Sequence, residues 1–189
     1  MRIIAGIAKG KRLFAPQGLS IRPTSDKVRE AIFNILGKEF CYKAVLDLFA
    51  GTGAMGIETL SRGAEHAVFV DNNASALRII KKNLDTCGLT ERYNIIKMDV
   101  IKALQPSAFR LGKGFNLIFI DPPYRREDAG TILELIEKNK LLADDGIIVL
   151  ETSKRTGVDE SLLRLKEFDV RRYGDTVVRF YKNFKERIQ

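Results

Sequence analysis

Apolar positions along the chain alternate between two spacings, and this alternation predicts strands and helices in turn. Short apolar runs rich in Val, Ile, Leu and Phe are typical of strands that are buried on both faces. Such runs occupy Ala44–Phe49, Ala67–Val70, Asn94–Met98, Phe115–Ile120 and Ile147–Leu150. Between them, apolar residues at helical spacing predict helices at about 54–61, 74–86, 100–104 and 129–138. Strands that alternate with helices predict a parallel sheet.

The N-terminal residues precede this alternation and follow a different pattern. Residues 2–5 and 12–14 are short apolar pieces around a turn that contains glycine, which predicts a hairpin. A helix is expected to begin near Asp26, because Thr24 or Ser25 can cap it and apolar residues then recur at helical spacing.

The C-terminal residues predict an antiparallel end to the sheet. Phe168–Tyr173 and Thr176–Tyr181 flank Gly174-Asp175, and a two-residue loop with glycine first is typical of a hairpin. The patterns together predict an α/β fold with a mostly parallel, seven-stranded sheet, helices on both faces and a C-terminal antiparallel hairpin. We divide the chain into an N-terminal hairpin and helix over 1–40 and a main domain over 41–189.

Composition places the chain among globular proteins. Of 189 residues, 45% are hydrophobic and 30% are charged, and no apolar run approaches the roughly 20 residues that a membrane span needs. The N-terminus lacks the long apolar region of a secretory signal, so we expect a cytoplasmic protein with no membrane partner. Cys41 and Cys87 stand far apart and His66 is the only histidine. We therefore expect neither a disulfide framework nor a metal site.

The charge balance favours a polyanionic partner. The formal net charge is +8, and the excess lies at the two ends of the chain. Residues 1–29 hold seven Lys and Arg against one acid, and residues 164–189 hold eight against four. A basic surface of this kind is typical of proteins that bind nucleic acid.

A glycine-rich segment between the first predicted strand of the main domain and the following helix predicts a nucleoside-binding loop. Gly51, Gly53 and Gly56 allow a tight turn and a close approach of a ligand to the backbone. Asp71 ends the next strand, where an acid can accept hydrogen bonds from ribose hydroxyls. Asp47 precedes the glycines and would repel a pyrophosphate, but it suits a cationic amine. This favours S-adenosylmethionine over a nicotinamide dinucleotide.

Two further acids follow predicted strands. Asp99 can accept a hydrogen bond from an adenine amino group or cap the short helix after it, and the sequence favours neither role. Asp121 lies at the end of a central strand, in the segment Asp121-Pro-Pro-Tyr124. Its carboxylate and the carbonyl of Pro122 can accept both hydrogens of an exocyclic amine and so direct the nitrogen lone pair at a methyl group. Tyr124 can stack on the base.

These segments resemble the ordered motifs of class I S-adenosylmethionine-dependent amino-methyltransferases. The resemblance rests on Asp47–Gly56, Asp71, Asp99 and Asp121–Tyr124. The segments Arg2–Gly6 and Arg22–Glu30 narrow it to the RsmD-type family, bacterial enzymes that methylate guanine N2 in small-subunit (16S) ribosomal RNA. It extends over nearly the whole chain. The family often has Glu at the position of Asp71, and the shorter carboxylate should still reach a ribose.

The resemblance implies a Rossmann-like class I methyltransferase fold, S-adenosylmethionine as cofactor, and ribosomal RNA or a small-subunit assembly particle as partner of a monomeric enzyme. The cofactor-binding residues that it implies are Asp47, Phe49, Gly51, Gly53, Gly56, Asp71, Asn72, Asp99 and Val100. The catalytic residues that it implies are Asp121, Pro122, Pro123 and Tyr124.

The expected reaction is a direct transfer of methyl to the amine, with no covalent enzyme intermediate. The base must be unpaired or flipped out to reach such a site. We expect the substrate-binding residues to be Arg22, Thr24, Lys27 and Arg29, although a run of charges also forms a solvated helix face. Three other functions fit parts of the sequence: a DNA adenine-N6 methyltransferase, a nicotinamide-linked oxidoreductase and a non-catalytic nucleic-acid-binding protein.

Overall fold

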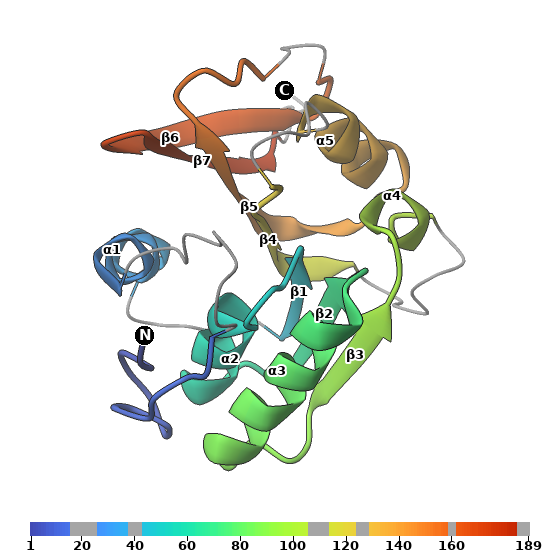
Figure 1. Cartoon of the computed structure of the whole chain (residues 1–189). Coiled ribbons are helices and arrows are strands. Elements are labelled where there is room, and N and C mark those ends of the chain that lie inside the picture. The colour runs from blue at the N-terminus through green and yellow to red at the C-terminus, as the bar shows by residue number, and fades with distance from the viewer. Residues whose placement is uncertain (16–25, 38–42, 106–113, 124–128, 159–161, 185–189) are drawn as a thin grey trace.

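A seven-stranded sheet forms the centre of the molecule (Figure 1). The computed structural model describes residues 1–15, 26–37, 43–105, 114–123, 129–158 and 162–184. The strands are β1 (Ala44–Leu48), β2 (His66–Asp71), β3 (Tyr93–Lys97), β4 (Phe115–Ile120), β5 (Leu142–Ser153), β6 (Leu165–Tyr173) and β7 (Thr176–Asn183). Their order in the sheet is β3-β2-β1-β4-β5-β7-β6. The first five strands along the chain pair in parallel, and β7 is antiparallel to both β5 and β6. The predicted fold class is confirmed.

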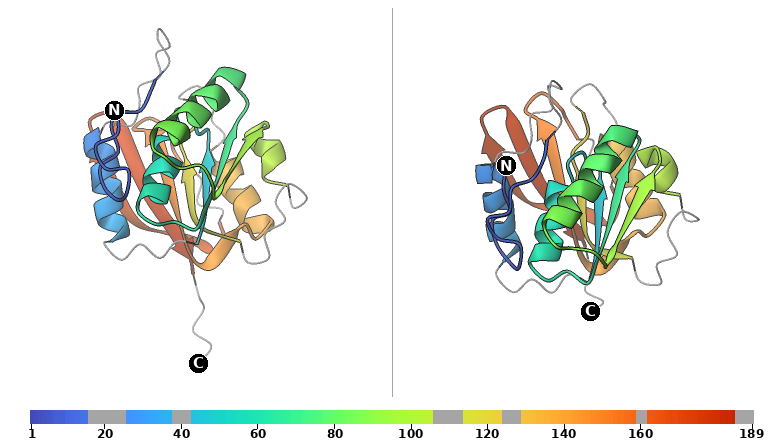
Figure 2. Two further views of the ribbon diagram at one scale, coloured as in Figure 1. Left: turned by 90° about the horizontal axis from the view of Figure 1, so that it is seen from below. Right: turned by 60° about the horizontal axis from the view of Figure 1, so that its bottom comes forward.

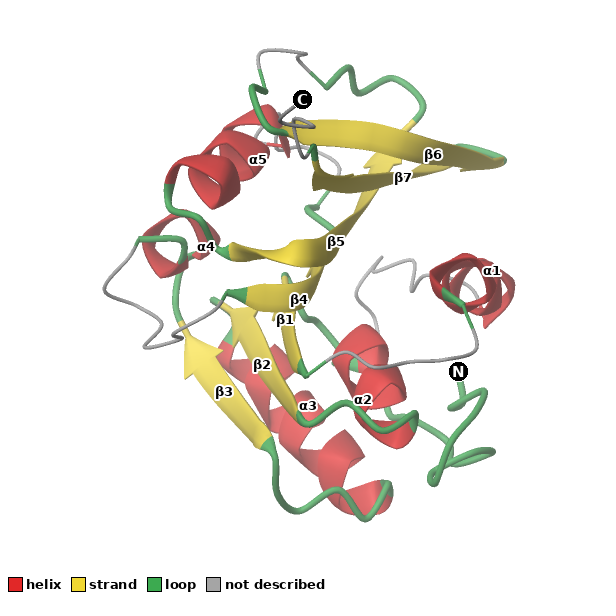
Figure 3. Cartoon of the chain, turned by 180° about the vertical axis from the view of Figure 1, so that it is seen from behind, coloured by secondary structure: helices red, strands yellow, loops and turns green. Residues whose placement is uncertain are grey.

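Helices cover the sheet on both faces (Figure 3). The helices are α1 (Asp26–Leu36), α2 (Ala54–Ser61), α3 (Ala74–Thr86), α4 (Val100–Ala103) and α5 (Ala129–Lys138). Apolar residues of α1, α2 and α3 share one buried cluster with alternate residues of the strands. Residues of α4 and α5 share a second cluster with the opposite strand face. Because successive strand side chains point to opposite faces, the continuous apolar runs supply both cores.

The longest strand differs most from its predicted bounds. The sequence predicts a strand over 147–150, whereas β5 extends from Leu142 to Ser153 with a register shift against β4 near its start. Two exposed acids and Gly146 interrupt the apolar run there. Gly146 is needed at this point because a Cβ would lie 2.6 Å from a methyl carbon of Leu142. The structure therefore continues the strand through residues that carry no apolar signal.

The predicted N-terminal hairpin is present as a single antiparallel bridge, Arg2 with Arg12, rather than as two regular strands. The reason is that the backbone N–H groups of Ile4 and Ala5 donate to the carboxylate of Glu58 on α2, at 2.8 and 3.0 Å, and not across the hairpin. Gly6 fits closely here, because a Cβ would lie 1.8 Å from the carbonyl oxygen of Ser61.

The N-terminal segment, residues 1–15, thus docks on the main domain. Apolar residues of this segment and of α1 belong to the same buried cluster as the sheet. The views of Figure 2 show the segment (dark blue) beside α1. The side-chain amide of Asn83 on α3 donates to the carbonyl of Phe14 and accepts from its N–H, so the end of the segment is also fixed. No helix in the described ranges is long and apolar enough to cross a membrane.

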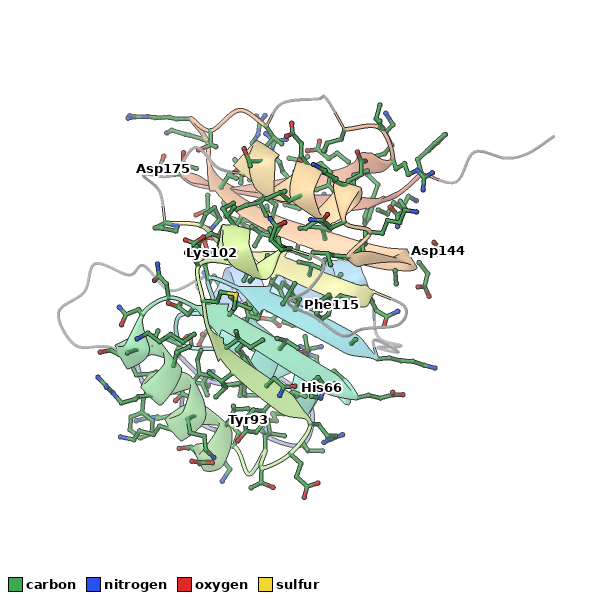
Figure 4. All side chains as sticks on the ribbon, turned by 90° about the vertical axis from the view of Figure 1, so that its right-hand side faces the viewer. His66, Tyr93, Lys102, Phe115, Asp144 and Asp175 are labelled. Atoms are coloured by element: carbon green, nitrogen blue, oxygen red, sulfur yellow. The ribbon has the colours of Figure 1, made fainter. Side chains whose placement is uncertain are left out.

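The strand order reverses between β1 and β4. From β1 the chain moves outward through β2 and β3, and it then returns to add β4 and β5 on the other side. Ligands of open α/β sheets bind outside the carboxyl ends of the strands at such a switch point. In Figure 4, Phe115 and His66 mark the amino ends of β4 and β2, and Lys102, on α4 after the end of β3, marks the opposite edge. The predicted site residues belong to that opposite edge.

Candidate active site

The glycine-rich loop after β1 takes a backbone path that few residues allow. Phe49, Gly51 and Gly53 have φ values of 57°, 54° and 74°, in the left-handed region. A positive φ is unusual for a residue with a side chain, such as Phe49, and residues of this kind occur most often at functional sites. Gly56, one turn into α2, is required for a different reason. A Cβ there would lie 2.3 Å from Cε1 of Phe69. The loop therefore brings α2 against the sheet with its N-terminus open toward the carboxyl edge.

Asp47 lies on β1 beneath this loop and is 4% exposed. Its Oδ2 accepts a hydrogen bond of 2.9 Å from the backbone N–H of Gly56. Burial raises the pKa of Asp47 to about 7; the hydrogen bond from Gly56 lowers it, and the nearby charge of Asp71 raises it further. An ammonium group placed against this carboxylate would relieve the cost of burying its charge.

Asp71 ends β2, and its carboxylate accepts hydrogen bonds from two segments of the site. Its Oδ2 accepts from the N–H of Gly51 at 2.9 Å, and its Oδ1 accepts from the N–H of Asn73 at 2.8 Å. The carboxylate thus holds the glycine loop and the start of α3 together, and each oxygen retains acceptor capacity. Asn72, which the resemblance assigns to cofactor binding, lies exposed at the same edge.

Asp99 follows β3 and caps α4. Its side chain accepts from the N–H groups of Ile101, at 3.0 Å, and Lys102, at 3.4 Å. The capping role that the sequence left open is confirmed, while the contact to an adenine amino group stays a prediction. Val100 is buried at the first position of α4, in the core on that face. Asp47, Asp71 and Asp99 thus occupy the carboxyl ends of three neighbouring parallel strands.

This set of acceptors fits a nucleoside that carries a cationic amine. Carboxylates at the ends of β1, β2 and β3 can accept hydrogen bonds from an ammonium group, ribose hydroxyls and an amino group. The same three charges oppose a pyrophosphate, which needs the donors and positive end of a helix. The chemistry of the edge therefore matches S-adenosylmethionine better than a dinucleotide.

Asp121 follows β4 on the other side of the switch point and is accessible to solvent. Protein atoms packed around its carboxylate, and then the charges of Glu151 and Asp47, raise the pKa of Asp121 well above its usual value. Pro122 is buried and Pro123 is exposed, whereas Tyr124 lies outside the described residues. The acceptor pair predicted at Asp121 and Pro122 thus stands beside the glycine loop, because β1 and β4 are direct neighbours.

Glu151 is a further acid at this edge, and the sequence analysis did not single it out. It lies within β5, one residue past Leu150, which pairs with Ile120 of β4. It therefore stands next to Asp121, and it is buried, with 8% of its surface exposed. An acid inside an apolar strand is a signal that could have found it, since an acid is seldom buried without a role.

The proposed RNA contacts divide into three cases. Arg22 and Thr24 lie outside the described residues, and Lys27 is exposed on α1. The prediction that Arg29 faces RNA phosphates is wrong, because its side chain is 0% exposed. Its Nη2 donates to the carbonyl of Arg2 and to Asp26, and its Nε lies 3.7 Å from Glu58.

The physical reason is the helical period of α1. Val28, Arg29, Ile32 and Phe33 form the face that packs against the main domain, and the charge of Arg29 is balanced there by Glu58. Arg29 therefore fastens α1 and the N-terminal segment to α2, and a charge count along the sequence could not reveal this.

Comparison with known proteins decides the family. The family model described as Conserved hypothetical protein 95 matches residues 1–182. The chain is 34% identical over 158 residues to ribosomal RNA small subunit methyltransferase D of Escherichia coli strain K12, covering 84% of this chain and 77% of the relative. The protein belongs to the family of ribosomal RNA small subunit methyltransferase D. A family member in Bacillus subtilis, "Putative rRNA methyltransferase YlbH", is 43% identical over 96% of this chain and 98% of its own length.

Solved structures agree with this membership. A structure described as "Putative methyltransferase yhhF from Escherichia coli" is 32% identical, with a TM-score of 0.84 and coverage of 97% of each chain. The SAH-bound methyltransferase PaMTH1 of Podospora anserina has a TM-score of 0.65 over 85% of this chain and 80% of its own, at 13% identity. The second likeness extends only to the fold, which is that of class I methyltransferases.

His66 and Cys87 lie away from this edge. His66 begins β2 and its Nε2 is 2.7 Å from Oδ1 of Asn94. Cys87 is a buried free thiol, and Cys41 is outside the described residues. Among the residues that the structure describes, no three His, Cys, Asp or Glu side chains are grouped to hold a metal ion.

Proposed function

We propose that the protein methylates the exocyclic N2 amine of a guanine in bacterial small-subunit (16S) ribosomal RNA, with S-adenosylmethionine as the methyl donor. The observation that carries the proposal is the placement of Asp121 and Pro122 at the end of β4, beside the glycine loop and the carboxylate of Asp47. Relatives in the family are named ribosomal RNA small subunit methyltransferase D, which supports a small-subunit ribosomal RNA substrate. A bacterial enzyme with this substrate works in the cytoplasm.

The donor would be held by the carboxyl ends of β1, β2 and β3. Asp47 would face its ammonium group, Asp71 its ribose hydroxyls and Asp99 its adenine amino group, with Phe49, Asn72 and Val100 around it. S-adenosylmethionine supplies an electrophilic methyl group on a sulfonium, so the amine nitrogen gains a methyl group and loses one proton.

The chain's own residues position the amine. The carboxylate of Asp121 and the carbonyl of Pro122 each accept one N–H of the substrate, which draws the nitrogen lone pair out of conjugation with the ring. A carboxyl with a raised pKa also holds a proton more readily, so Asp121 can receive the one that the nitrogen loses. Catalysis of this kind relies on position and electrostatics rather than on a covalent intermediate.

The RNA backbone would be held by cations around the N-terminal residues. Lys27 on α1 and four exposed cations of the N-terminal segment are candidates. Those four are Arg2, Lys9, Lys11 and Arg12. Phosphate contacts of this kind weaken steeply as salt rises.

The test is methyl transfer from radiolabelled S-adenosylmethionine by the purified chain. Small-subunit RNA, partly assembled small subunits and genomic DNA are offered in parallel, and labelled nucleosides are identified after digestion. We expect N2-methylguanine from the ribosomal substrate. N6-methyladenine in DNA as the only product would replace this function with the adenine alternative, which shares the Asp-Pro-Pro-Tyr motif.

The matched variant is Asp121→Asn, which keeps the size of the side chain and removes the anionic acceptor. We expect it to lose at least 100-fold in kcat while the dissociation constant for S-adenosylmethionine changes less than threefold, since loss of one charged contact to the transition state costs about 2.7–4 kcal/mol. An exposed acid on β5, changed in Asp144→Asn, is the control. Normal turnover by the Asp121 variant would remove this residue from the reaction.

A further inference from the structure

We infer that Glu151 is a specificity-determining residue of the same site, and that it accepts the N1–H of the guanine whose N2 amine is held by Asp121 and Pro122. The inference rests on the proposed function and adds a second recognition group to it. It concerns the discrimination between guanine and adenine. The Asp-Pro-Pro-Tyr motif does not determine this, because the adenine alternative shares it.

The sheet register places Glu151 beside Asp121. Phe119 pairs with Val149 and Ile120 pairs with Leu150, so the next residues are Asp121, directly after β4, and Glu151 on β5. Neighbouring strands lie about 4.8 Å apart. The two acids thus form one row across the edge of the sheet.

Both side chains point to the same face. Phe119 and Val149 belong to one buried cluster, and a step of two residues along a strand returns to the same face. Val178 of β7, which pairs with Glu151, is also in that cluster. Asp47 lies on this face as well, one strand beyond β4. The three carboxylates therefore lie on one face of the sheet at its carboxyl edge, and the influence of Glu151 and Asp47 on the pKa of Asp121 agrees with this arrangement.

The donors of guanine match this row of acceptors. Its Watson–Crick edge presents N1–H beside the two hydrogens of the N2 amine. Asp121 and Pro122 accept the two hydrogens of the amine, so the N1–H of guanine can donate to the neighbouring carboxylate of Glu151. A carboxylate offers about four acceptor positions, so Glu151 can accept this bond in addition to others. Adenine presents a lone pair at N1 beside its N6 amine, and a carboxylate next to a lone pair is unfavourable.

The size of the effect follows from one hydrogen bond to a charged group. Such a bond is worth a factor of about 10 to 150 in kcat/KM. The probe is 2-aminopurine, which keeps the reacting amine, replaces N1–H with a lone pair and carries hydrogen in place of O6, so the role of Glu151 is read from the change of preference in its variants. We therefore expect the wild-type protein to prefer guanine to 2-aminopurine by that factor at the methylated position.

The experiment compares two RNAs that differ only in this base. The position is first mapped by mass spectrometry, and small-subunit RNA is then rebuilt by splint ligation with guanine or 2-aminopurine there. Glu151→Gln should reduce the preference to less than about threefold, because a carboxamide can present either an acceptor or a donor to N1. Glu151→Asp keeps the anionic acceptor and should keep the preference at a lower rate, which also covers a failure of the first variant to fold.

The matched control is Thr152→Val. Thr152 is the next residue of β5 and is buried, but it points to the opposite face and its hydroxyl has no hydrogen-bond partner among the described residues. A merely structural role of Glu151 would lower the rates on both RNAs equally and leave their ratio unchanged.

An unchanged ratio in Glu151→Gln, or no preference in the wild type, would overturn the inference while leaving guanine methylation intact. Failure of the wild type to label the guanine RNA, with transfer to DNA, would instead overturn the proposed function.

Discussion

The buried carboxylate of Asp47 should cost the free protein stability above neutral pH, and Asp47→Asn should remove that cost. The pKa of Asp47 is raised from 3.8 to about 7 on folding, chiefly by burial. A carboxyl with a raised pKa contributes most to stability when it is protonated. This contribution is complete below about pH 4 and is lost as the pH rises through about 7.

The magnitude follows from linkage between these two pKa values. Between pH 5 and pH 8 the folded state loses about 2–3 kcal/mol of stability through this group. The carboxamide of the variant cannot ionise, and its oxygen can still accept the bond from the N–H of Gly56. The free energy of unfolding of the variant, minus that of the wild type, should therefore rise by about 2–3 kcal/mol over this pH range, or about 5–10 °C in Tm.

The assay is urea unfolding of both proteins at pH 5 and pH 8 without cofactor. The quantity to compare is the unfolding free energy of the variant minus that of the wild type, at pH 5 and at pH 8. Any cost of burying the amide is the same at both pH values and cancels in this comparison. Asp144→Asn removes an exposed carboxylate and is the control. If the difference in unfolding free energy between variant and wild type is equal at the two pH values, the conclusion that Asp47 is a buried carboxylate with a raised pKa is wrong. The same variant of Asp47 should bind S-adenosylmethionine at least tenfold more weakly, since the amine loses a charge-assisted bond.

Other consequences can be checked separately. Gly56→Ala should cost about 1–3 kcal/mol of unfolding free energy, because its Cβ would overlap Phe69, whereas Gly130→Ala on α5 meets no atom within 4 Å and should be neutral or stabilising. Urea titration distinguishes them, and equal effects would contradict the close packing. Glu58→Ala should destabilise by about 3 kcal/mol and speed amide exchange in the N-terminal segment, since it removes a buried acceptor of two backbone N–H groups; unchanged exchange would argue against the docking. Lys27→Ala should reduce the salt slope of RNA binding by about one, and an unaltered slope would remove Lys27 from the interface.

The sequence by itself determined the order and kind of nearly every element. Apolar runs of strand length and helical spacing depend only on local pattern, so β4 and α3 were predicted with the bounds that the structure has. The glycine loop and Asp71 were equally visible, because a turn that needs positive φ restricts the residue types at each position. The capping role of Asp99 was one of two local options, and its hydrogen bonds show it directly.

Only the tertiary structure decided which charges face solvent and which carboxylates become neighbours. Arg29 lies among cations in the sequence, yet the period of α1 turns it inward to Glu58, a residue 29 positions away. Glu151 lies 30 positions beyond Asp121, and only the register of β4 and β5 makes them neighbours. The physical reason is common to both cases. Electrostatic environment depends on distances through space and on exclusion of water, and residues far apart in the chain fix both.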